Sequence, residues 1–176
     1  MGNINGFEIP GGLLDYKGLD ATQSVSSTLV LMDSISVPAG TFKSNDVFLI
    51  QSLITRDVTT LGTITHYIYW NTNAFNFSGA VLLATSQGPT VLVPSSAVEY
   101  VPLYRTVCVV DSTTTLVYNT SSGDYSTDLG DTSGNQLTNA ISTITSINWN
   151  IDGFLIVAAA DTTTQTLTKR YFTILR

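Results

Sequence analysis

The sequence predicts an all-β protein, an antiparallel β-sandwich of jelly-roll type with an irregular N-terminal arm. Hydroxyl residues fill the polar positions, with 27 Thr and 18 Ser against three Lys and two Glu. Thr is β-branched and suits a half-exposed pleated surface, whereas Lys and Glu suit exposed helices. Nine short apolar or alternating runs are separated by turn signals. Such spacing is typical of sandwiches and barrels, and 176 residues suit one eight-stranded jelly roll.

The chain divides into two zones. Residues 1–26 are Gly-rich and lack strand alternation, so we expect an arm there and not a separate domain. The alternative is that this range packs back on its own sandwich as an extra edge strand. Residues 27–176 alternate between short strands and turns rich in Gly, Pro, Asp, Ser and Thr, and we expect them to form the jelly-roll domain. The expected strands cover residues 27–37, 46–56, 63–72, 79–86, 98–110, 114–120, 144–151, 154–161 and 167–175.

Two of these segments show which face is buried. In 63–72, Ile64, His66, Ile68 and Trp70 alternate with Thr and Tyr and would share the apolar face. In 144–151, Ile and Trp alternate with Asn, and the Asp-Gly pair that follows is a favoured hairpin turn. We therefore expect Trp70 and Trp149 at or near the core.

The run "FLIVAAA" at 154–160 is almost continuously apolar, which predicts burial on both faces. One face would belong to the core of the sandwich. The other would be covered by another subunit, which the small side chains of residues 158–160 would allow to approach closely. The run therefore favours a homo-oligomer.

Charge excludes two classes of partner. The net charge is −6 and only seven residues are Lys or Arg, so no basic stripe is present to neutralise nucleic-acid phosphates. An anionic membrane surface would repel the chain for the same reason. No apolar run approaches the ~18 residues that a membrane helix needs. We expect neither nucleic-acid binding nor membrane insertion.

The residue inventory argues against an enzyme. His66 and Cys108 are the single His and the single Cys, too few for a common zinc site, and no "GxSxG", "GxxxxGK[ST]" or "GxGxxG" motif occurs. Cys108 lies in the run "RTVCVV", where a buried structural thiol is the expected reading. Nothing in the sequence pairs two carboxylates as a glycosidase requires. We therefore expect no catalytic residues, no cofactor and no metal ligands.

Two local features leave alternatives open. Asp124, Asp128 and Asp131 could hold Ca²⁺ through oxygen ligands, but their spacing does not match an EF-hand loop, and we favour a solvated acidic loop. His66 is best read as a structural or interfacial residue, with pH sensing or ligand contact as the alternatives.

Tyrosines are the remaining sign of a binding surface. Exposed Tyr suits either a subunit interface or the stacking of sugar rings, and we favour the interface. The tyrosines in question are Tyr67, Tyr69, Tyr100, Tyr104, Tyr118 and Tyr125.

Three segments, taken in order, resemble small jelly-roll virion proteins of tailed bacteriophages. They are "ISVPAGTFKSNDVFLI", "TITHYIYWNTNAFNFSGAVLLATS" and "ITSINWNIDGFLIVAAAD". In that group an apolar-Pro-Ala-Gly-Thr segment leads into the next strand. A later strand ends in Asn-Thr and is followed by a Ser-Gly-Ala-x-Leu-Leu-Ala-Thr run. A Trp-containing strand and hairpin then close the domain. The resemblance covers roughly residues 35–176.

The resemblance implies a virion structural protein, made in the host cytoplasm and displayed on the particle as a capsid-decorating or fibre component. It implies a homo-oligomer, with a trimer expected, and carries over no catalytic residue. Attachment to other virion proteins through residues 1–26 is our own expectation. The alternative function is a receptor- or glycan-binding module of a phage tail or fibre, whose partner would be a host-surface glycan or protein.

Overall fold

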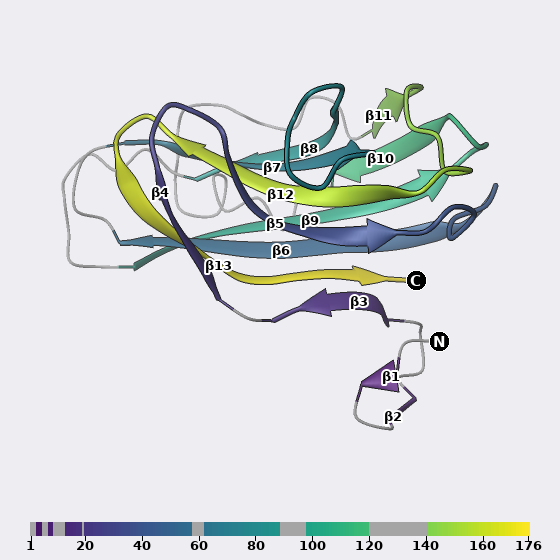
Figure 1. Ribbon diagram of the computed structural model, residues 1–176, viewed down its shortest axis with the longest axis horizontal. Helices are drawn as coiled ribbons and strands as arrows, with labels where there is room; N and C mark the ends of the chain where they lie inside the picture. The colour runs from purple at the N-terminus through teal and green to yellow at the C-terminus, as the bar shows by residue number, and fades with distance from the viewer. Residues whose placement is uncertain are drawn as a thin grey trace.

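The protein folds into two antiparallel β-sheets that face each other (Figure 1). The computed structural model describes residues 3–4, 7–8, 13–18, 20–57, 62–88, 98–119 and 141–176. Within these residues there is no helix, and every strand pairing is antiparallel, so the predicted all-β class is confirmed. A short pair, β1 (Asn3–Ile4) with β2 (Phe7–Glu8), stands apart from both sheets.

The large sheet has the order β11-β10-β9-β6-β13-β3, with β4 also paired to β13. Its strands are β3 (Leu13–Lys17), β4 (Ala21–Val25), β6 (Val47–Asp57), β9 (Val98–Val109), β10 (Thr115–Asn119), β11 (Ile141–Ile144) and β13 (Gln165–Leu175). The small sheet has the order β5-β12-β7-β8. Its strands are β5 (Val30–Val37), β7 (Ile64–Asn71), β8 (Val81–Gln87) and β12 (Gly153–Asp161).

Eight of these strands are paired in a nested order. β4 pairs with β13, β5 with β12, β6 with β9, and β7 with β8. The first of these eight strands thus pairs with the last, the second with the second last, and so on inward along the chain. The pairs β4–β13 and β6–β9 lie in the large sheet, and the pairs β5–β12 and β7–β8 lie in the small sheet. The hairpin of β10 and β11 extends the large sheet beyond β9.

Apolar side chains from both sheets fill the space between them. Each long strand sends alternate residues inward, as the two-residue period of a strand requires. Ile50, Ile54 and Val101 of the large sheet and Ile68 and Leu155 of the small sheet are completely buried in one continuous cluster. The core therefore belongs to the pair of sheets and not to either alone.

One end of the core is aromatic. Trp149 lies against the rings of Phe42, Phe48 and Trp70, with ring centroids 5.1, 5.8 and 4.8 Å away. The predicted core positions of Trp70 and Trp149 are confirmed, since their exposed fractions are 3% and 1%. A Cβ at Gly153 would lie 2.3 Å from the Trp70 ring, so only glycine fits beside it.

The three segments that carry the bacteriophage resemblance meet at this aromatic end. The Pro-Ala-Gly-Thr turn is tied to the Trp149 loop by the Gly40 N–H, which donates to the Trp149 carbonyl over 2.8 Å. A second tie runs from the Ala39 N–H to the Asp152 carboxylate, also over 2.8 Å. Gly40 has a φ of 71°, a left-handed conformation that favours glycine. The Pro-Ala-Gly-Thr motif therefore forms a turn whose backbone N–H groups hold the distant Trp149 loop in place.

The prediction of an irregular N-terminal arm is wrong for part of residues 1–26. β3 and β4 lie within that range and pair with the two halves of β13, along the edge opposite β6 (Figure 1). A strand that adds to a sheet edge is held by backbone hydrogen bonds, so its sequence does not need to alternate between apolar and polar side chains. Whether this range also anchors the protein to a particle stays a prediction.

The predicted strand over 144–151 is also wrong. β11 ends at Ile144, and the following residues cross from the large sheet to the small sheet without pairing as a strand. The backbone N–H of Trp149 donates instead to the Ser112 carbonyl over 2.9 Å. Ile147 and Trp149 are nevertheless buried, while Ile151 is 42% exposed. The alternation of apolar and polar residues in this segment therefore comes from two side chains that enter the core from a loop and not from a strand.

Burial of the apolar run 154–160 on both faces is confirmed, but the expected reason is wrong. Leu155 and Val157 face the core, while Ile156 and Ala158 point outward, and all four are fully buried within a single chain. β12 lies between β5 and β7, and its outward residues pair across strands with Tyr69 and Tyr67. A second subunit is therefore not needed to remove this strand from water.

Candidate interaction surface

The outer face of the large sheet is the most unusual surface of the protein. We define it as the side chains of five strands that alternate with core residues. They are Val47, Leu49, Gln51, Leu53 and Thr55 on β6; Val98, Tyr100, Pro102, Tyr104, Thr106 and Cys108 on β9; Leu116 and Tyr118 on β10; Ile141 and Thr143 on β11; and Thr166, Thr168, Tyr171, Thr173 and Leu175 on β13.

This outer face is apolar and hydroxyl-rich. None of the side chains just listed is charged, and Arg170 at the margin pairs with Asp20. Val47, Leu49, Tyr100 and Ile141 are 40–51% exposed there. In its middle the hydroxyls of Tyr104 and Tyr171 bond to each other over 2.8 Å, from the two strands that flank β6. The result is a broad uncharged surface with hydrogen-bonding groups scattered over it.

The charged side chains of the same sheet point the other way. Arg56, Glu99, Arg105 and Lys169 lie on inward positions of β6, β9 and β13, and the two Arg and the Lys are at most 2% exposed. In soluble monomers the charged side chains of a sheet ordinarily point to solvent, because burying a charge costs free energy, and the apolar side chains ordinarily point to the core. In the large sheet, four charged side chains instead point inward, among inward residues that are mainly apolar.

A buried cluster of three charged residues accounts for part of the inward charge. Arg56 donates from Nη1 to Asp161 Oδ2 over 2.6 Å and from Nε to Glu99 Oε2. Its remaining nitrogen, Nη2, donates to the Gly62 carbonyl over 2.9 Å. Asp161 belongs to the small sheet, whereas Arg56 and Glu99 belong to the large sheet, so the cluster joins the two sheets.

The two carboxylates of this cluster are not equivalent. Asp161 Oδ1 also accepts hydrogen bonds from the backbone and hydroxyl of Thr163. Glu99 Oε1 is buried and has no hydrogen-bond partner. Burial raises the pKa of Glu99, as does the nearby Asp161 charge, while Arg56 acts in the opposite direction. Both acids are bound to one guanidinium and shielded from water, so the pair holds Arg56 in place between the two sheets.

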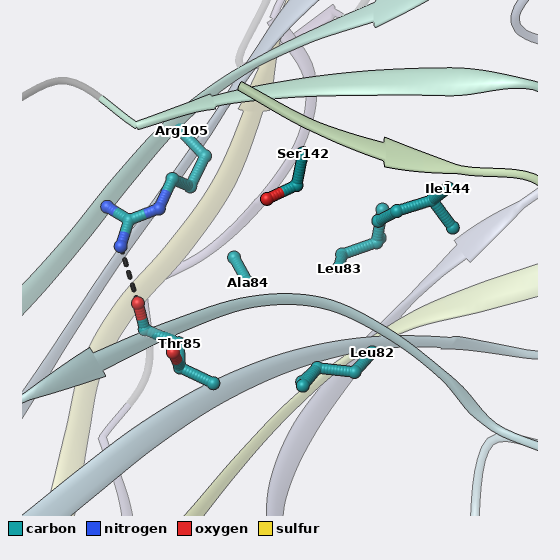
Figure 2. A pocket seen from close by; sticks show the side chains of 7 residues that line it. All are labelled: Leu82, Leu83, Ala84, Thr85, Arg105, Ser142 and Ile144. Carbon is teal, nitrogen blue, oxygen red and sulfur yellow. Dashed lines mark hydrogen bonds between the residues drawn. The ribbon is translucent and has the colours of Figure 1, made fainter. Parts of the chain in front are cut away.

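Lys169 and Arg105 bridge the sheets elsewhere. Lys169 Nζ lies 2.8 Å from Asp33 Oδ2 on β5. Arg105 extends from β9 and donates from Nη2 to the Thr85 carbonyl on β8, as Figure 2 shows. It also lines a pocket of about 230 Å³ between β8 and β11. The other lining residues are Leu82, Leu83, Ala84, Thr85, Ser142 and Ile144.

The described lining of this pocket combines one guanidinium, two hydroxyls and aliphatic side chains. Neither a carboxylate nor an imidazole is among those residues, so a nucleophile and its base are not brought together there.

His66 is a core residue. It is fully buried on β7, as its alternation with Ile64, Ile68 and Trp70 predicts. Its Nδ1 lies 3.2 Å from the Val101 carbonyl and donates to it, whereas Nε2 is buried without a partner. Burial, with a smaller contribution from the Arg105 charge, lowers the pKa of His66 to about 3. The imidazole therefore stays neutral throughout the physiological range and does not sense pH there.

A second aromatic group lies on the outer face of the small sheet. Tyr67 and Tyr69 alternate with the buried residues of β7, as predicted, and their ring centroids are 5.9 Å apart. Phe77, in the turn after β7, lies 5.5 Å from Tyr69. This group of three rings is smaller than the outer face of the large sheet, but it offers a cluster of aromatic groups to a ligand.

The other residues singled out from the sequence are distributed as follows. Cys108 lies in a strand, but on the outer face of the large sheet and only half-buried, so its prediction as a core thiol is wrong. Tyr100, Tyr104 and Tyr118 all belong to that same face. Asp124, Asp128, Asp131 and Tyr125 lie outside the described residues. In the described part of the chain, His, Cys, Asp and Glu do not form a group that could hold a metal ion.

The sequence analysis listed Tyr100 and Tyr104 among exposed tyrosines and favoured an interface, but it did not predict the inward charged residues of the large sheet. One signal for them was present: the run "VEYVPLYRTVCVV" places Glu99 and Arg105 in one register and the tyrosines in the other. Arg56 and its partners carry no such signal, because they are 43 and 105 residues apart.

Comparison with known proteins gives no relative: no protein-family model, curated protein or solved structure matches this chain. Across the described residues, no helix is long and apolar enough to cross a membrane.

Proposed function

We propose that this chain is a structural protein of a bacteriophage virion, displayed on the particle as a capsid-decorating or fibre component. It would act by assembly and display and not by catalysis. The proposal includes a jelly-roll topology, a homo-oligomeric state with three copies as the expectation from the resemblance, and attachment to other virion proteins through the N-terminal residues.

The observation that carries the proposal is the distribution of charged side chains in the large sheet. A protein that spends its life as a solvated monomer gains nothing from an uncharged outer face above four inward-pointing charged residues. A subunit of a permanent assembly does gain, because depletion of charge and enrichment in Tyr and aliphatic residues characterise the cores of subunit interfaces.

The nested strand order supports the jelly-roll part of the proposal. Pairing β4 with β13, β5 with β12, β6 with β9 and β7 with β8 places four of these eight strands in each sheet, and β3, β10 and β11 are added to the large sheet. A double-sheet jelly roll contains eight strands arranged as two Greek keys. Many unrelated functions use this architecture, so the strand order supports the fold and not the location.

The virion assignment is tested by finding the protein in particles. Phage particles purified by density gradient should contain this chain at a fixed number of copies, measured by quantitative mass spectrometry against the major capsid protein. Decoration of intact heads or fibres by an antibody raised to the chain should show where it is displayed. Its absence from washed, infectious particles would overturn the proposal.

The second candidate function is binding of a host-surface glycan. The cluster of Tyr67, Tyr69 and Phe77 favours it, because aromatic rings exposed on a sheet are suited to stacking on sugar rings. Deleting the gene discriminates the two functions. Particles that assemble normally but no longer adsorb to the host would favour glycan binding, and adsorption that survives deletion would exclude it. In adsorption assays Tyr67→Ala with Tyr69→Ala should then act like the deletion.

A further inference from the structure

We infer that the outer face of the large sheet is the surface on which a second copy of this chain docks. This inference rests on the proposed assembly role and specifies the surface that the role would use. The surface differs from the one indicated by the sequence, where the run 154–160 pointed to the small sheet, because that run is already buried within one chain.

The size of the face is adequate for a stable contact. β6, β9 and β13 have 11, 12 and 11 residues, while β10 and β11 extend the sheet with 5 and 4 residues. With a rise of ~3.3 Å per residue and a strand spacing of ~4.8 Å, the face covers roughly 700 Å². A standard interface buries about 800 Å² on each partner, so this face alone approaches what a specific complex requires.

The charge distribution favours another copy as the occupant. The chain carries a net charge of −6, so two copies repel each other over most of their surfaces. The side chains that define this face are uncharged, and two cations at its margins are paired, Arg170 with Asp20 and Arg176 with Asp46. Two copies can therefore bring these faces together without placing like charges against each other.

The side chains available are also self-complementary. Leu49 and Val47 supply exposed aliphatic area, and Tyr100 adds an aromatic ring with a hydroxyl at its tip. Repeated on a symmetry-related copy, these groups give apolar contacts at the centre and hydrogen bonds between hydroxyls, which is the composition of a homo-oligomer interface.

The test compares two leucines of similar exposure on opposite sheets. Leu49 on β6 is 40% exposed and Leu82 on β8 is 44% exposed. Leu49→Lys places a cation in the proposed interface, while Leu82→Lys places the same cation on the small sheet. Light scattering after size-exclusion chromatography at micromolar concentration should show an oligomer for the wild-type chain and for Leu82→Lys. Leu49→Lys should be a monomer, with an apparent dissociation constant raised by at least roughly 30-fold.

The natural thiol supplies an independent readout. Cys108 is the single cysteine and lies on the same face, paired across strands with Val47. In the assembled wild-type protein a maleimide reagent should label it at least roughly tenfold more slowly than in monomeric Leu49→Lys. Val47→Lys, at a position 51% exposed, should reproduce both results if Leu49→Lys fails to give the wild-type circular dichroism spectrum.

Three outcomes would overturn the inference: a monomeric wild-type chain, equal behaviour of the two lysine variants, or dissociation by Leu82→Lys alone. The last would move the interface to the small sheet. These failures are separable from failure of the proposed function. A monomer that is nevertheless present in virions would refute the interface and keep the function, and an oligomer absent from virions would do the reverse.

Discussion

The indole N–H of Trp149 donates a hydrogen bond to Thr115 Oγ1 over 2.9 Å, and both residues are buried. Trp149 lies in the segment that crosses between the sheets, whereas Thr115 begins β10 at the end of the large sheet. The bond fixes the orientation of a ring that packs against Phe42, Phe48 and Trp70. It therefore joins the crossing segment to the aromatic end of the core.

Replacing Thr115 by Val should destabilise the protein. Val has nearly the same shape and suits a strand, but it leaves the buried indole N–H without an acceptor. We expect the free energy of unfolding to fall by about 1–3 kcal/mol, measured by urea denaturation at a fixed protein concentration. Thr85→Val, at an exposed position of β8 in the small sheet, serves as the control and should change stability little. Equal effects of the two changes would show that the bond contributes nothing.

His66 should remain neutral in the folded protein well into the acid range. Its folded pKa of about 3 lies below the ordinary value of 6.5, so between these pH values the unfolded chain binds more protons. This residue therefore lowers the free energy of unfolding as the pH falls through that window. Because the chain has one His, its imidazole proton NMR signal is identified without mutation and should not shift between pH 8 and about pH 4. A titration midpoint near 6.5 would contradict the buried, uncharged state.

The sequence predicted what depends on local periodicity. The alternation of His66 with Ile64, Ile68 and Trp70 placed the inward face of β7 correctly, because a strand in a sandwich must turn every second residue to the core. The continuous run 154–160 likewise marked β12 as buried on both sides. In both cases the signal and its cause lie within a few residues of each other.

What the sequence did not predict depends on partners far along the chain. β3 and β4 become strands because β13 offers an unpaired edge, and their own residues show no alternation. The crossing segment around Trp149 alternates like a strand, yet its backbone bonds go to Ser112 and Gly40, which belong to other turns. The tyrosines of β9 were predicted to be exposed, but the inward direction of Glu99 and Arg105 was visible only once pairing showed which register of β9 faces the core.

Neutralising Glu99 should change how stability depends on pH. Burial raises the pKa of Glu99 above its ordinary value of 4.5, so just above pH 4.5 the folded state binds more protons than the unfolded state. Ionisation of Glu99 therefore costs stability as the pH rises through its folded pKa. Glu99→Gln keeps an oxygen that can accept from Arg56 Nε but removes the charge. Relative to this variant, the wild-type protein should gain stability as the pH is lowered from 7 toward 4.5.

The free energy of unfolding of the wild-type protein and of Glu99→Gln is measured by denaturant titration at each pH, and the difference between the two is compared across pH, so that the contribution of His66 cancels. Asp161→Asn, which changes the other carboxylate of the cluster, is the matched variant. Its new amide would face the Thr163 N–H or Arg56 Nη1, both of which are donors, so it should be destabilising at every pH. If the wild-type advantage over Glu99→Gln grew toward pH 7, Glu99 would be a stabilising anion and the assignment would be wrong.

The N-terminal residues are tested by two shortened chains, one starting at Leu13 and one starting at Ser27. The chain from Ser27 lacks β3 and β4, which leaves the edge of β13 unpaired. Its melting temperature should fall by more than about 5 °C, since each kcal/mol lost lowers it by several degrees in a domain of this size. The chain from Leu13 keeps both strands and should melt like the full-length protein.

Mixed with particles that lack the protein, the chain from Leu13 should fail to bind if residues 1–12 hold the anchor, and should bind normally if the anchor lies elsewhere. A chain from Ser27 as stable as the full-length protein would show that the strand pairing adds nothing, and residues 1–26 would then be a separable arm as the sequence indicated.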